Sequence, residues 1–454
     1  SNTNMNNPHV VTINKSGSEG AYITIKNLDG HNPKIEFDGR GGIVISDYMN
    51  YIIVEGFEVE GPAANITYDQ AIADREYKVL AASDVNDNIT YNHTYFSGKG
   101  IWGGYKAHNN IIIKNNKVYN CTGSGIRFND SDHITIENNE VYNCTWWTSS
   151  ASSAIVYAET IAEDGDNTTD VKMIMRGNLV YNNWNRIPFY VTQLPDNSGN
   201  TNPNYGTANY NNILDGQGLY VTRSDPSYLG TFLFENNVCV NNGKNGINFD
   251  NSLSASAIYQ NNTLYYNGVH EIIQDISVAE GNPAHRGQKV GGIKANKVQN
   301  ATVVNNIVVT RDNEFSALSL NNIDNPETVD PETGEPDYDG IKIATNNIFL
   351  NGTVAYPGNQ EPANLIDMNP EFINVPSVVN GAIDISQTNF KLTEGSPAID
   401  AGNTNYSPST DIDGIPRPAN ITDAISYSSF ENSTDGWTQF GASIAISSDE
   451  SVTG

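Results

Sequence analysis

The chain has 454 residues and carries 24 Lys and Arg against 52 Asp and Glu, a formal net charge of −28. This balance argues against nucleic acid as a partner, because phosphate binding draws much of its affinity from basic side chains. The sequence contains no apolar run of about 18 residues, which argues against membrane insertion. One compact core rarely grows to this length, so we expect several domains or a repeating fold that lengthens without thickening.

Charged residues make up 17% of the chain, whereas Asn, Gly, Thr, Ser and Tyr are abundant. Segments of high helical propensity are scarce. Such a composition is typical of a strand-rich and turn-rich repeat fold. Strong acidity commonly accompanies solubility outside the cell, so we expect a secreted protein, extracellular or at the cell surface.

The first expected strands lie in residues 12–39, which include Ile23-Thr24-Ile25 and Lys34-Ile35-Glu36-Phe37. These segments resemble the opening coils of secreted β-helix carbohydrate-active enzymes. A capping segment usually precedes such coils, and none is visible in the sequence. We therefore expect the natural chain to begin earlier.

A short alternating strand closed by an Asn pair recurs along the chain. The pairs are Asn115-Asn116, Asn138-Asn139, Asn236-Asn237, Asn261-Asn262, Asn305-Asn306 and Asn346-Asn347. Some neighbouring copies lie 139 − 116 = 23 and 262 − 237 = 25 residues apart, the length of one coil of a parallel β-helix. Asn tolerates the left-handed turn at such a corner, where its side chains stack. The repeat predicts an all-β fold, a right-handed parallel β-helix that forms a single-stranded solenoid of about ten or more coils.

Three cysteines are too few for a disulfide framework. Cys121 and Cys144 end the similar segments Val118-Tyr119-Asn120-Cys121 and Val141-Tyr142-Asn143-Cys144. This similarity places them on adjacent coils. We expect a stack of buried thiols, with a disulfide as the alternative.

In each coil, a Val-Tyr-Asn type strand follows the Asn corner, and a third strand begins near Gly-Ile. If the aliphatic residue points inward, strand alternation turns the next residue outward. One exposed column is then predicted to contain Trp102, Arg127, Val156, Tyr220, Asn248 and Lys294. A second column beside it is predicted to contain Asn129, Thr222, Asp250 and Asn296.

Three long inserts are expected at Trp146 to Asp170, Trp184 to Ile213 and Val269 to Val290. All three are assigned to the turn between the second and third strands, so they should rise beside the exposed column. Loops of this length in a compact fold are usually functional. We expect long inserts on one side and a groove, open at both ends and shaped for a long chain.

The central region, about residues 100–265, is similar to the broad β-helix superfamily of polysaccharide lyases and glycoside hydrolases. Its most characteristic stretch is Asp215-Gly216-Gln217-Gly218-Leu219, followed by Asn241-Asn242-Gly243-Lys244-Asn245-Gly246-Ile247. The paired-aspartate calcium motif of one pectate lyase family is missing from the sequence. The resemblance implies a polysaccharide substrate and a monomer, and the β-helix endo-fucanase type is one version of it.

Near the end of the chain, residues 390–402 and 411–418 resemble the terminal cap of many secreted bacterial β-helix proteins. We therefore expect a β-helix catalytic domain at 1–425, with the cap at about 386–425. Residues 426–454 resemble the first strands of a carbohydrate-binding β-sandwich. Because 29 residues cannot form that sandwich, we interpret them as the stub of a longer module, with a simple strand on the helix as the alternative.

Candidate catalytic residues are carboxylates near the third strand. Glycoside hydrolysis needs one carboxyl group to protonate the leaving oxygen and another to activate water or attack the sugar. Asp215 precedes one third strand, Asp250 ends the next, and Glu159 lies in the turn after the third strand of the coil before Asp215. We expect these carboxylates within roughly 5 to 10 Å of one another, although an Asp-Gly pair can be only a turn. His270, which begins the third insert, is a further candidate acid or base, with a solvated loop histidine as the alternative.

Positive charge is rare, so its position is informative. Arg127, Lys294, Arg223 and Lys244 are expected on or beside the floor, where they would hold sulfate or carboxylate groups. The alternative is a stacked ion pair, such as Lys294 with Asp250. The predicted substrate-binding residues are Arg127, Tyr220, Asn248, Lys294, Arg223, Trp102, Trp146 and Trp147, although the last two could equally anchor their own loop.

No cofactor is required by this hypothesis, and no metal ligand is assigned. Structural calcium is possible at two oxygen-rich loops, Asp164-Gly165-Asp166-Asn167 and Asp337-Tyr338-Asp339-Gly340. The leading hypothesis is an endo-acting glycoside hydrolase on an anionic, sulfated polysaccharide, with sulfated fucan or carrageenan-like chains suggested by the resemblance. The alternatives are a lyase on an alginate-type or pectate-type uronate polymer, with Lys294 or an Arg as base, and a non-catalytic carbohydrate-binding adhesin.

Overall fold

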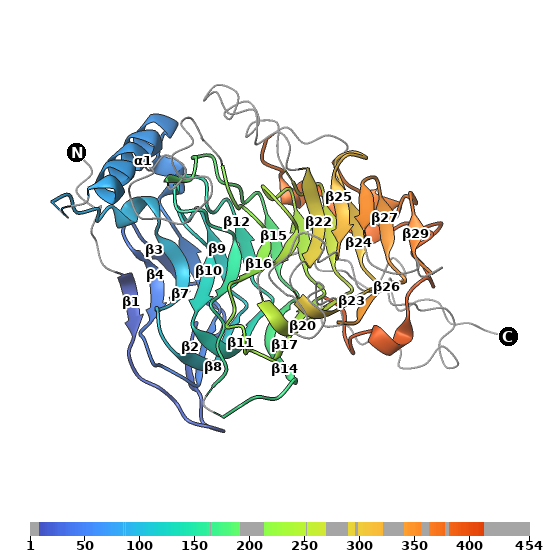
Figure 1. Cartoon of the computed structure of the whole chain (residues 1–454), viewed down its shortest axis with the longest axis horizontal. Helices are drawn as coiled ribbons and strands as arrows, with labels where there is room; N and C mark the ends of the chain where they lie inside the picture. Colours follow the sequence, from blue (N-terminus) through green and yellow to red (C-terminus); the bar gives the residue numbers. More distant parts are fainter. Residues whose placement is uncertain are drawn as a thin grey trace, which may run out of the picture.

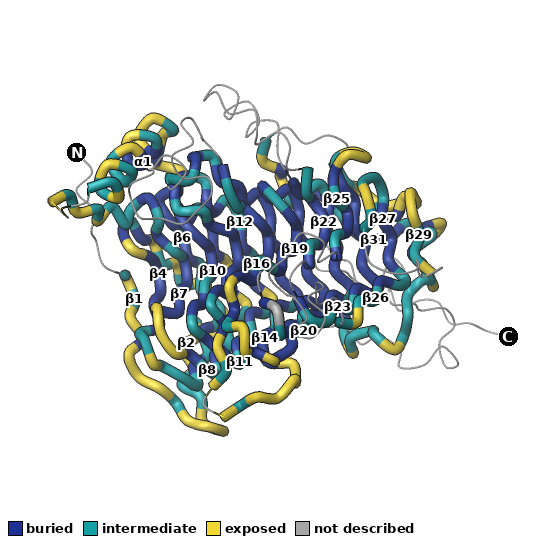
Figure 2. Tube along the Cα trace, in the orientation of Figure 1, coloured by how far each residue is buried: buried dark blue, intermediate teal, exposed yellow. Residues whose placement is uncertain are grey.

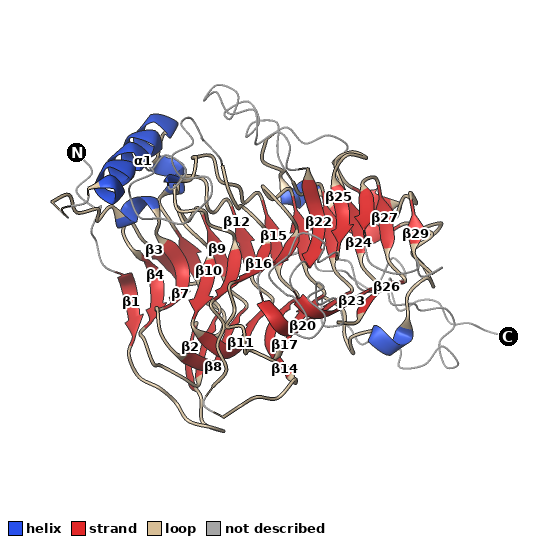
Figure 3. Cartoon of the chain, viewed as in Figure 1, coloured by secondary structure: helices blue, strands red, loops and turns tan. Residues whose placement is uncertain are grey.

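Three long parallel sheets wind around one axis, and successive strands along the chain pass from one sheet to the next (Figures 1 and 3). Within the described part of the chain the sheets contain ten, nine and ten strands, which confirms the prediction of a parallel β-helix of about ten or more coils. The computed structural model describes residues 9–190, 213–268, 289–320, 340–355, 363–376 and 381–412, except for 85, 87, 164, 251, 296 and 297.

Sheet I contains the strands that end at the Asn corner. Its members are β2 (Ile23–Lys26), β5 (Ile52–Glu55), β8 (His108–Lys114), β11 (Ser131–Glu137), β14 (Val171–Arg176), β17 (Thr231–Glu235), β20 (Ser252–Gln260), β23 (Val298–Val304) and β26 (Lys342–Thr345). The first Asn of each predicted pair has a positive φ, between 54° and 57°. The second Asn is buried and donates from its side-chain amide to the next Asn along the axis, at 2.9 to 3.1 Å. These bonds confirm the predicted Asn ladder.

Sheet II contains the Val-Tyr strands. Its members are β3 (Lys34–Glu36), β6 (Glu58–Glu60), β9 (Lys117–Tyr119), β12 (Glu140–Tyr142), β15 (Leu179–Tyr181), β18 (Val238–Val240), β21 (Thr263–Tyr265), β24 (Ile307–Val309), β27 (Ile348–Leu350) and β29 (Leu365–Ile366). Cys121 and Cys144, just after β9 and β12, are buried free thiols, which confirms the predicted stack. A second Asn ladder follows the thiols at this corner. Asn183 accepts from the Cys144 backbone N–H and donates to Asn242, which donates to Asn267.

Sheet III contains the third strands. Its members are β1 (His9–Ile13), β4 (Gly41–Ile45), β7 (Lys99–Gly103), β10 (Ile126–Asn129), β13 (Ile155–Ala158), β16 (Leu219–Thr222), β19 (Ile247–Asp250), β22 (Val290–Ala295), β25 (Ser316–Ser319) and β28 (Thr353–Ala355). In β7, a Cβ at Gly100 would lie 2.2 Å from the Val118 side chain, so only glycine fits at this position.

The core is a continuous apolar stack inside the coil. Buried residues, dark blue in Figure 2, recur in coil after coil along the axis. On sheet III its inward ladder is in register from coil to coil, and every member is fully buried. The ladder comprises Ile101, Ile126, Ile155, Leu219, Ile247 and Ile293. Because each coil buries its apolar face only against its neighbours, stability grows by stacking.

Helix α1 (Tyr68–Ser83), which was not predicted from the sequence, lies in an insertion between β6 and β7 (Figure 1). Thr67 and Gln70 form a capping box at its N-terminus. The short helices η1 (Ala63–Asn65) and η2 (Thr94–Phe96) flank it in the same insertion. The insertion leaves from the corner between sheets II and III, where the long inserts were predicted.

The first predicted insert, 146–170, is partly wrong because β13 lies inside it. Residues 146–154 lead from β12 into β13 at the expected corner, whereas 159–170 lead from β13 into β14 at the next corner. The second insert, 184–213, does lie between β15 and β16. Most of the third insert, 269–288, is outside the described residues.

The C-terminal segment lies against the outer face of sheet II. Its antiparallel strands, β30 (Phe372–Asn374) and β31 (Asn389–Leu392), and the short helix η6 (Ile385–Gln387) pack beside apolar residues of β15 to β27. The short helix η7 (Thr404–Tyr406) follows Asn403, whose backbone bonds to the Asn305 side chain at the Asn corner. Asn side chains at the corners donate to its backbone, for example Asn182 to Ile383 O at 2.8 Å. The predicted cap therefore covers the side of the coil in its described part, and residues 413–454, including the predicted module stub, are outside the described residues.

Within the described residues, no helix is both long and apolar enough to cross a bilayer.

Candidate functional site

The outer face of sheet III carries the predicted column. Backbone pairing places Trp102, Arg127, Val156, Tyr220, Asn248 and Lys294 at one register position of successive coils. The second column is also in register and contains Asn129, Ala158, Thr222 and Asp250. Asn296, also predicted there, is outside the described residues. Strand alternation alone was enough to predict this arrangement.

The column is less exposed than predicted. Val156 is fully buried, and Trp102 and Asn248 are 5% and 6% exposed. Arg127, Tyr220 and Lys294 are half-buried. An outward-pointing residue on one strand can still be covered by its neighbours, so strand alternation predicts direction and not exposure.

A hydrogen-bonded chain of polar side chains crosses three coils on this face. The Arg127 Nε donates to Asn129 Oδ1 at 2.8 Å, and Asn129 Nδ2 donates to Glu159 Oε2 at 3.4 Å. The other Glu159 oxygen lies 2.8 Å from the Arg223 guanidinium. Glu159 and Arg223 each follow a strand of sheet III, at corners where both have positive φ. The stacking of equivalent corners therefore brings this carboxylate and this cation together.

Asp215 and Asp250 both act electrostatically on Tyr220 and Lys244. Burial, followed by the charges of Asp215 and Asp250, raises the pKa of Tyr220. Burial also lowers the pKa of Lys244, and the two carboxylates oppose that shift. Among the described residues, Asp215 accepts a hydrogen bond from Gln217 Nε2 at 3.3 Å. Asp215 and Asp250 thus act on one group of side chains, while their separation from Glu159 stays a prediction.

Cations on this face perturb one another. Burial, followed by the charge of Arg223, lowers the pKa of Arg127, whereas Glu159 and Asp215 act in the opposite direction. Lys294 contributes to the lowered pKa of Lys244. The predicted binding residues Arg127, Arg223 and Lys294 therefore belong to the same electrostatic neighbourhood as the predicted carboxylates.

The tryptophans after β12 anchor loops, which is the alternative left open by the sequence. Trp147 is 7% exposed and donates to Ala63 O at 2.7 Å. The half-buried Trp146 donates to Asn182 O at 2.9 Å and stacks on Trp184, with ring centroids 5.3 Å apart. The Arg186 guanidinium lies 3.9 Å from the Trp146 ring centroid. These contacts argue against Trp147 as an open platform for sugars.

Two cations near the site were missed from the sequence. Lys99 begins β7, and Lys78 lies on α1. Burial, followed by the charges of Arg127, Lys78 and Arg40, lowers the pKa of Lys99 to about 7. The repeat pattern could have identified Lys99, because this residue directly precedes the third-strand signal Gly100-Ile101-Trp102. Lys78 required a prediction of α1. The other predicted residue, His270, is outside the described residues.

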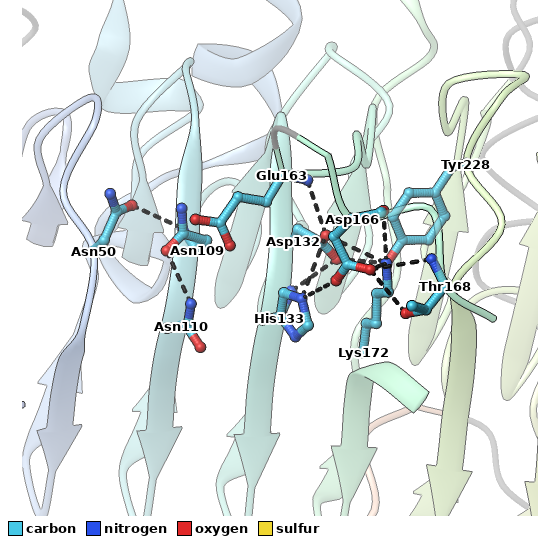
Figure 4. A network of polar contacts seen from close by, with 10 residues as sticks. All are labelled: Asn50, Asn109, Asn110, Asp132, His133, Glu163, Asp166, Thr168, Lys172 and Tyr228. Carbon is cyan, nitrogen blue, oxygen red and sulfur yellow. Dashed lines mark hydrogen bonds and ion pairs between the residues drawn. The ribbon is translucent and has the colours of Figure 1, made fainter. Parts of the chain in front are cut away.

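The loop 159–170 forms a separate polar network at the corner between sheets III and I (Figure 4). Ligand atoms of Asp132, His133 and Asp166 lie within 4.8 Å of one another, a spacing that could hold a metal ion. The Lys172 ammonium, however, lies 2.8 Å from Asp166 and 3.9 Å from Asp132. His133 Nε2 is also 2.8 Å from Asp166. A calcium ion at Asp166 would have to displace this ammonium, so the geometry does not favour the predicted calcium loop here; Asp337 and Asp339 of the second loop are outside the described residues.

Comparison with known proteins agrees with the architecture. A family model described as "Right handed beta helix region" matches residues 9–193. No curated protein matches the chain. Similar solved structures include pectate lyase Pel9A, at 12% identity and a TM-score of 0.44, with 89% of this chain and 83% of that chain covered.

Two further structures are less similar. The Dettilon tailspike protein has 12% identity and a TM-score of 0.29, covering 77% of this chain and 63% of that one. The complex of XylC with xylose has 13% identity and a TM-score of 0.27, covering 94% and 64%. The chain thus spans less than two thirds of the length of these two proteins. Identities and TM-scores this low say nothing of reaction or substrate.

Proposed function

We propose that the chain binds and cleaves an anionic extracellular polysaccharide along the outer face of sheet III. One observation carries the proposal. Successive coils bring the hydrogen-bonded side chains Arg127, Asn129, Glu159 and Arg223 to the same face as Asp215 and Asp250. Carboxylates interleaved with cations can act on a glycosidic bond and hold an acidic sugar in place.

The proposed reaction is endo-acting hydrolysis. Asp215 and Asp250 are the proposed acid and base, because Asp215 precedes β16, Asp250 ends the adjacent β19, and both act on Tyr220 of β16. Glu159 is held by Asn129 and Arg223, and a carboxylate fixed by two partners is suited to positioning the substrate or its neighbours. A sugar bound over Tyr220 would lie between these carboxylates.

The proposed substrate class follows from the charges. The whole chain carries −28, yet Arg127, Arg223, Lys244 and Lys294 gather on this face. Local cations of this kind can reverse the repulsion between an acidic protein and an acidic polymer. Sulfated fucan or carrageenan-like chains remain the first candidates from the sequence resemblance, and secretion is part of the same proposal.

Elimination on a uronate polymer is the second candidate, and one observation favours it. A lyase base removes the proton α to a carboxylate that a cation neutralises. Burial lowers the pKa of Lys244, the neighbour of Lys294, which increases its neutral fraction. Arg127 could neutralise the substrate carboxylate. This version moves the predicted base from Lys294 to Lys244.

A depolymerisation screen against sulfated and uronate polysaccharides tests both candidates. Reducing ends without ultraviolet absorbance from an unsaturated product would select hydrolysis, and that absorbance would select elimination. Binding without cleavage would instead select the adhesin.

Asp215→Asn tests the proposed acid or base. This change keeps the shape of the side chain while removing its charge and proton, so cleavage should fall by roughly 100- to 10,000-fold. Asp367→Asn is the matched control, because Asp367 also has positive φ but follows β29 on sheet II. Wild-type activity in Asp215→Asn would exclude Asp215 from acid or base chemistry.

A further inference from the structure

Four cations from separate segments converge beside the N-terminal coils of sheet III. Arg40 precedes β4, Lys78 lies on α1, Lys99 begins β7 and Arg127 lies on β10. The pKa of Lys99 is lowered to about 7 by burial first, and then by the charges of Arg127, Lys78 and Arg40. The Lys99 backbone N–H donates to Arg40 O at 3.1 Å, and Arg127 pairs in register with Trp102, whose ring centroid lies 4.6 Å from the Lys99 ammonium. These cations therefore lie close enough to repel one another.

Few acidic groups offset this repulsion. In the part of the chain described, neither Arg40, Lys99 nor Arg127 forms an ion pair with a carboxylate, although Glu159 and Asp215 act on Arg127 at longer range. Such a grouping is unexpected in a protein with 52 acidic and 24 basic residues. Like charges that remain together without acidic partners indicate a site for an external anion.

The Lys78 ammonium is held in place by its neighbours. It donates to the Ser150 hydroxyl and lies 4.2 Å from the Tyr190 ring centroid and 5.1 Å from that of Tyr91. Burial lowers its pKa to about 8, and the charge of Asp74 opposes the shift. Asp74 is itself bound by Tyr91 and His93, at 2.7 Å each.

Two buried ring nitrogens beside Lys99 give an independent sign of a polar ligand. The Lys99 ammonium lies 4.6 Å from the Trp102 ring centroid. Trp102 is 5% exposed, yet its Nε1 has no hydrogen-bond partner among the described residues. The same holds for Nδ1 of His9, whose ring lies 5.4 Å from that of Trp102. Buried polar atoms normally have a partner, so a missing ligand group would account for both.

We propose that Arg40, Lys78, Lys99 and Arg127 form a subsite for a sulfate or carboxylate group of the bound polysaccharide. This inference rests on the proposed function and deepens it by naming what the substrate carries. The subsite lies toward the N-terminal end of the proposed catalytic residues, and Arg127 belongs to both. With about 4.8 Å between paired strands, β7 and β16 are three steps, or about 14 Å, apart. A substrate that engages both sites must therefore be a chain of several sugars.

Binding at this subsite should depend on pH in a defined direction. An anion beside Lys99 favours its charged form, so affinity should be highest below about pH 7 and decline above it. The groups that face Lys99 are Lys78, Arg40, Arg127 and His9. The pKa of His9 is lowered to about 4, mainly by burial, so His9 stays neutral over this range.

The test compares Lys99→Met, Lys99→Arg and wild type by calorimetric titration with a sulfated galactan oligosaccharide and an oligouronate. If wild type cleaves the probe, all variants carry Asp215→Asn. Lys99→Met should weaken binding at pH 6 by about tenfold or more, since it removes charge-assisted hydrogen bonds. Lys99→Arg should bind at pH 6 and keep its affinity at pH 8.5. The probe that loses affinity identifies sulfate or carboxylate as the preferred group.

Lys117→Met is the matched control, because Lys117 lies on sheet II, 3.5 Å from Glu140. Undiminished binding of both probes by Lys99→Met would overturn the subsite, and so would an equal loss in Lys117→Met. Inorganic sulfate separates this test from the proposed function. At matched ionic strength and pH 6, it should raise the melting temperature of wild type more than that of Lys99→Met, whether or not any polymer is cleaved. An equal rise in both proteins would also overturn the subsite.

Discussion

Asn237 illustrates how one side chain of the ladder satisfies several buried groups. Its amide donates to Met175 O at 2.8 Å and to Asn262 Oδ1 at 3.0 Å. Its carbonyl oxygen accepts from the backbone and the side chain of Asn178, at 3.1 and 3.0 Å. Asn237→Ala should therefore lower the free energy of unfolding by about 1–3 kcal/mol for each buried group left without a partner.

Urea denaturation followed by circular dichroism measures this loss. Asn92→Ala is the control, because Asn92 is exposed and outside the ladder. Equal stability of the two variants would mean that water or relaxation replaces the ladder bonds.

At the scale of the element, α1 depends on contacts made outside its own insertion. Trp147 donates to Ala63 O, and the buried Arg75 donates from Nε to Pro188 O at 2.9 Å. Trp147→Phe keeps most of the apolar ring but removes one of these bonds. We expect faster amide hydrogen exchange in residues 63–83, with exchange in β8 and β11 unchanged. If the variant and wild type exchange residues 63–83 at the same rate, α1 is not anchored by this hydrogen bond.

The same elements show how far the sequence determines the site. Strand alternation predicted the register of Arg127, Tyr220 and Lys294, because parallel coils repeat one pattern of inward and outward residues. It did not predict the burial of Trp102, whose ring contacts His9 of β1 and Tyr105, just after β7. The fold could be predicted because it is a repeat, whereas the cationic cluster also needs Lys78, which comes from the non-repeating insertion that carries α1.

Helix α1 was missed for a related reason. A helix is recognised in a sequence by the apolar stripe that it buries. In Tyr68–Ser83 the buried residues are Ala71, Asp74 and Arg75, two of which are charged, so the apolar stripe is weak. The capping box at Thr67 and Gln70 was a usable signal, and it was overlooked. Because α1 was not predicted, Lys78 was not predicted as part of the site either.

At the scale of the whole molecule, net charge should make salt act in opposite directions on folding and on binding. A charge of −28 destabilises the compact state through self-repulsion, and added salt screens it. The screening length falls from about 30 Å at 0.01 M to about 3 Å at 1 M. The melting temperature should therefore rise as sodium chloride is increased from low concentration. Affinity for an anionic polysaccharide should fall over the same range, because the local cations that attract it are screened as well.

Differential scanning calorimetry and affinity electrophoresis on the same samples would measure the two trends. A neutral polysaccharide provides the control, since its affinity should change little. If affinity for the anionic polymer rises with salt, cations do not govern binding, and sheet III must recognise its ligand through uncharged contacts.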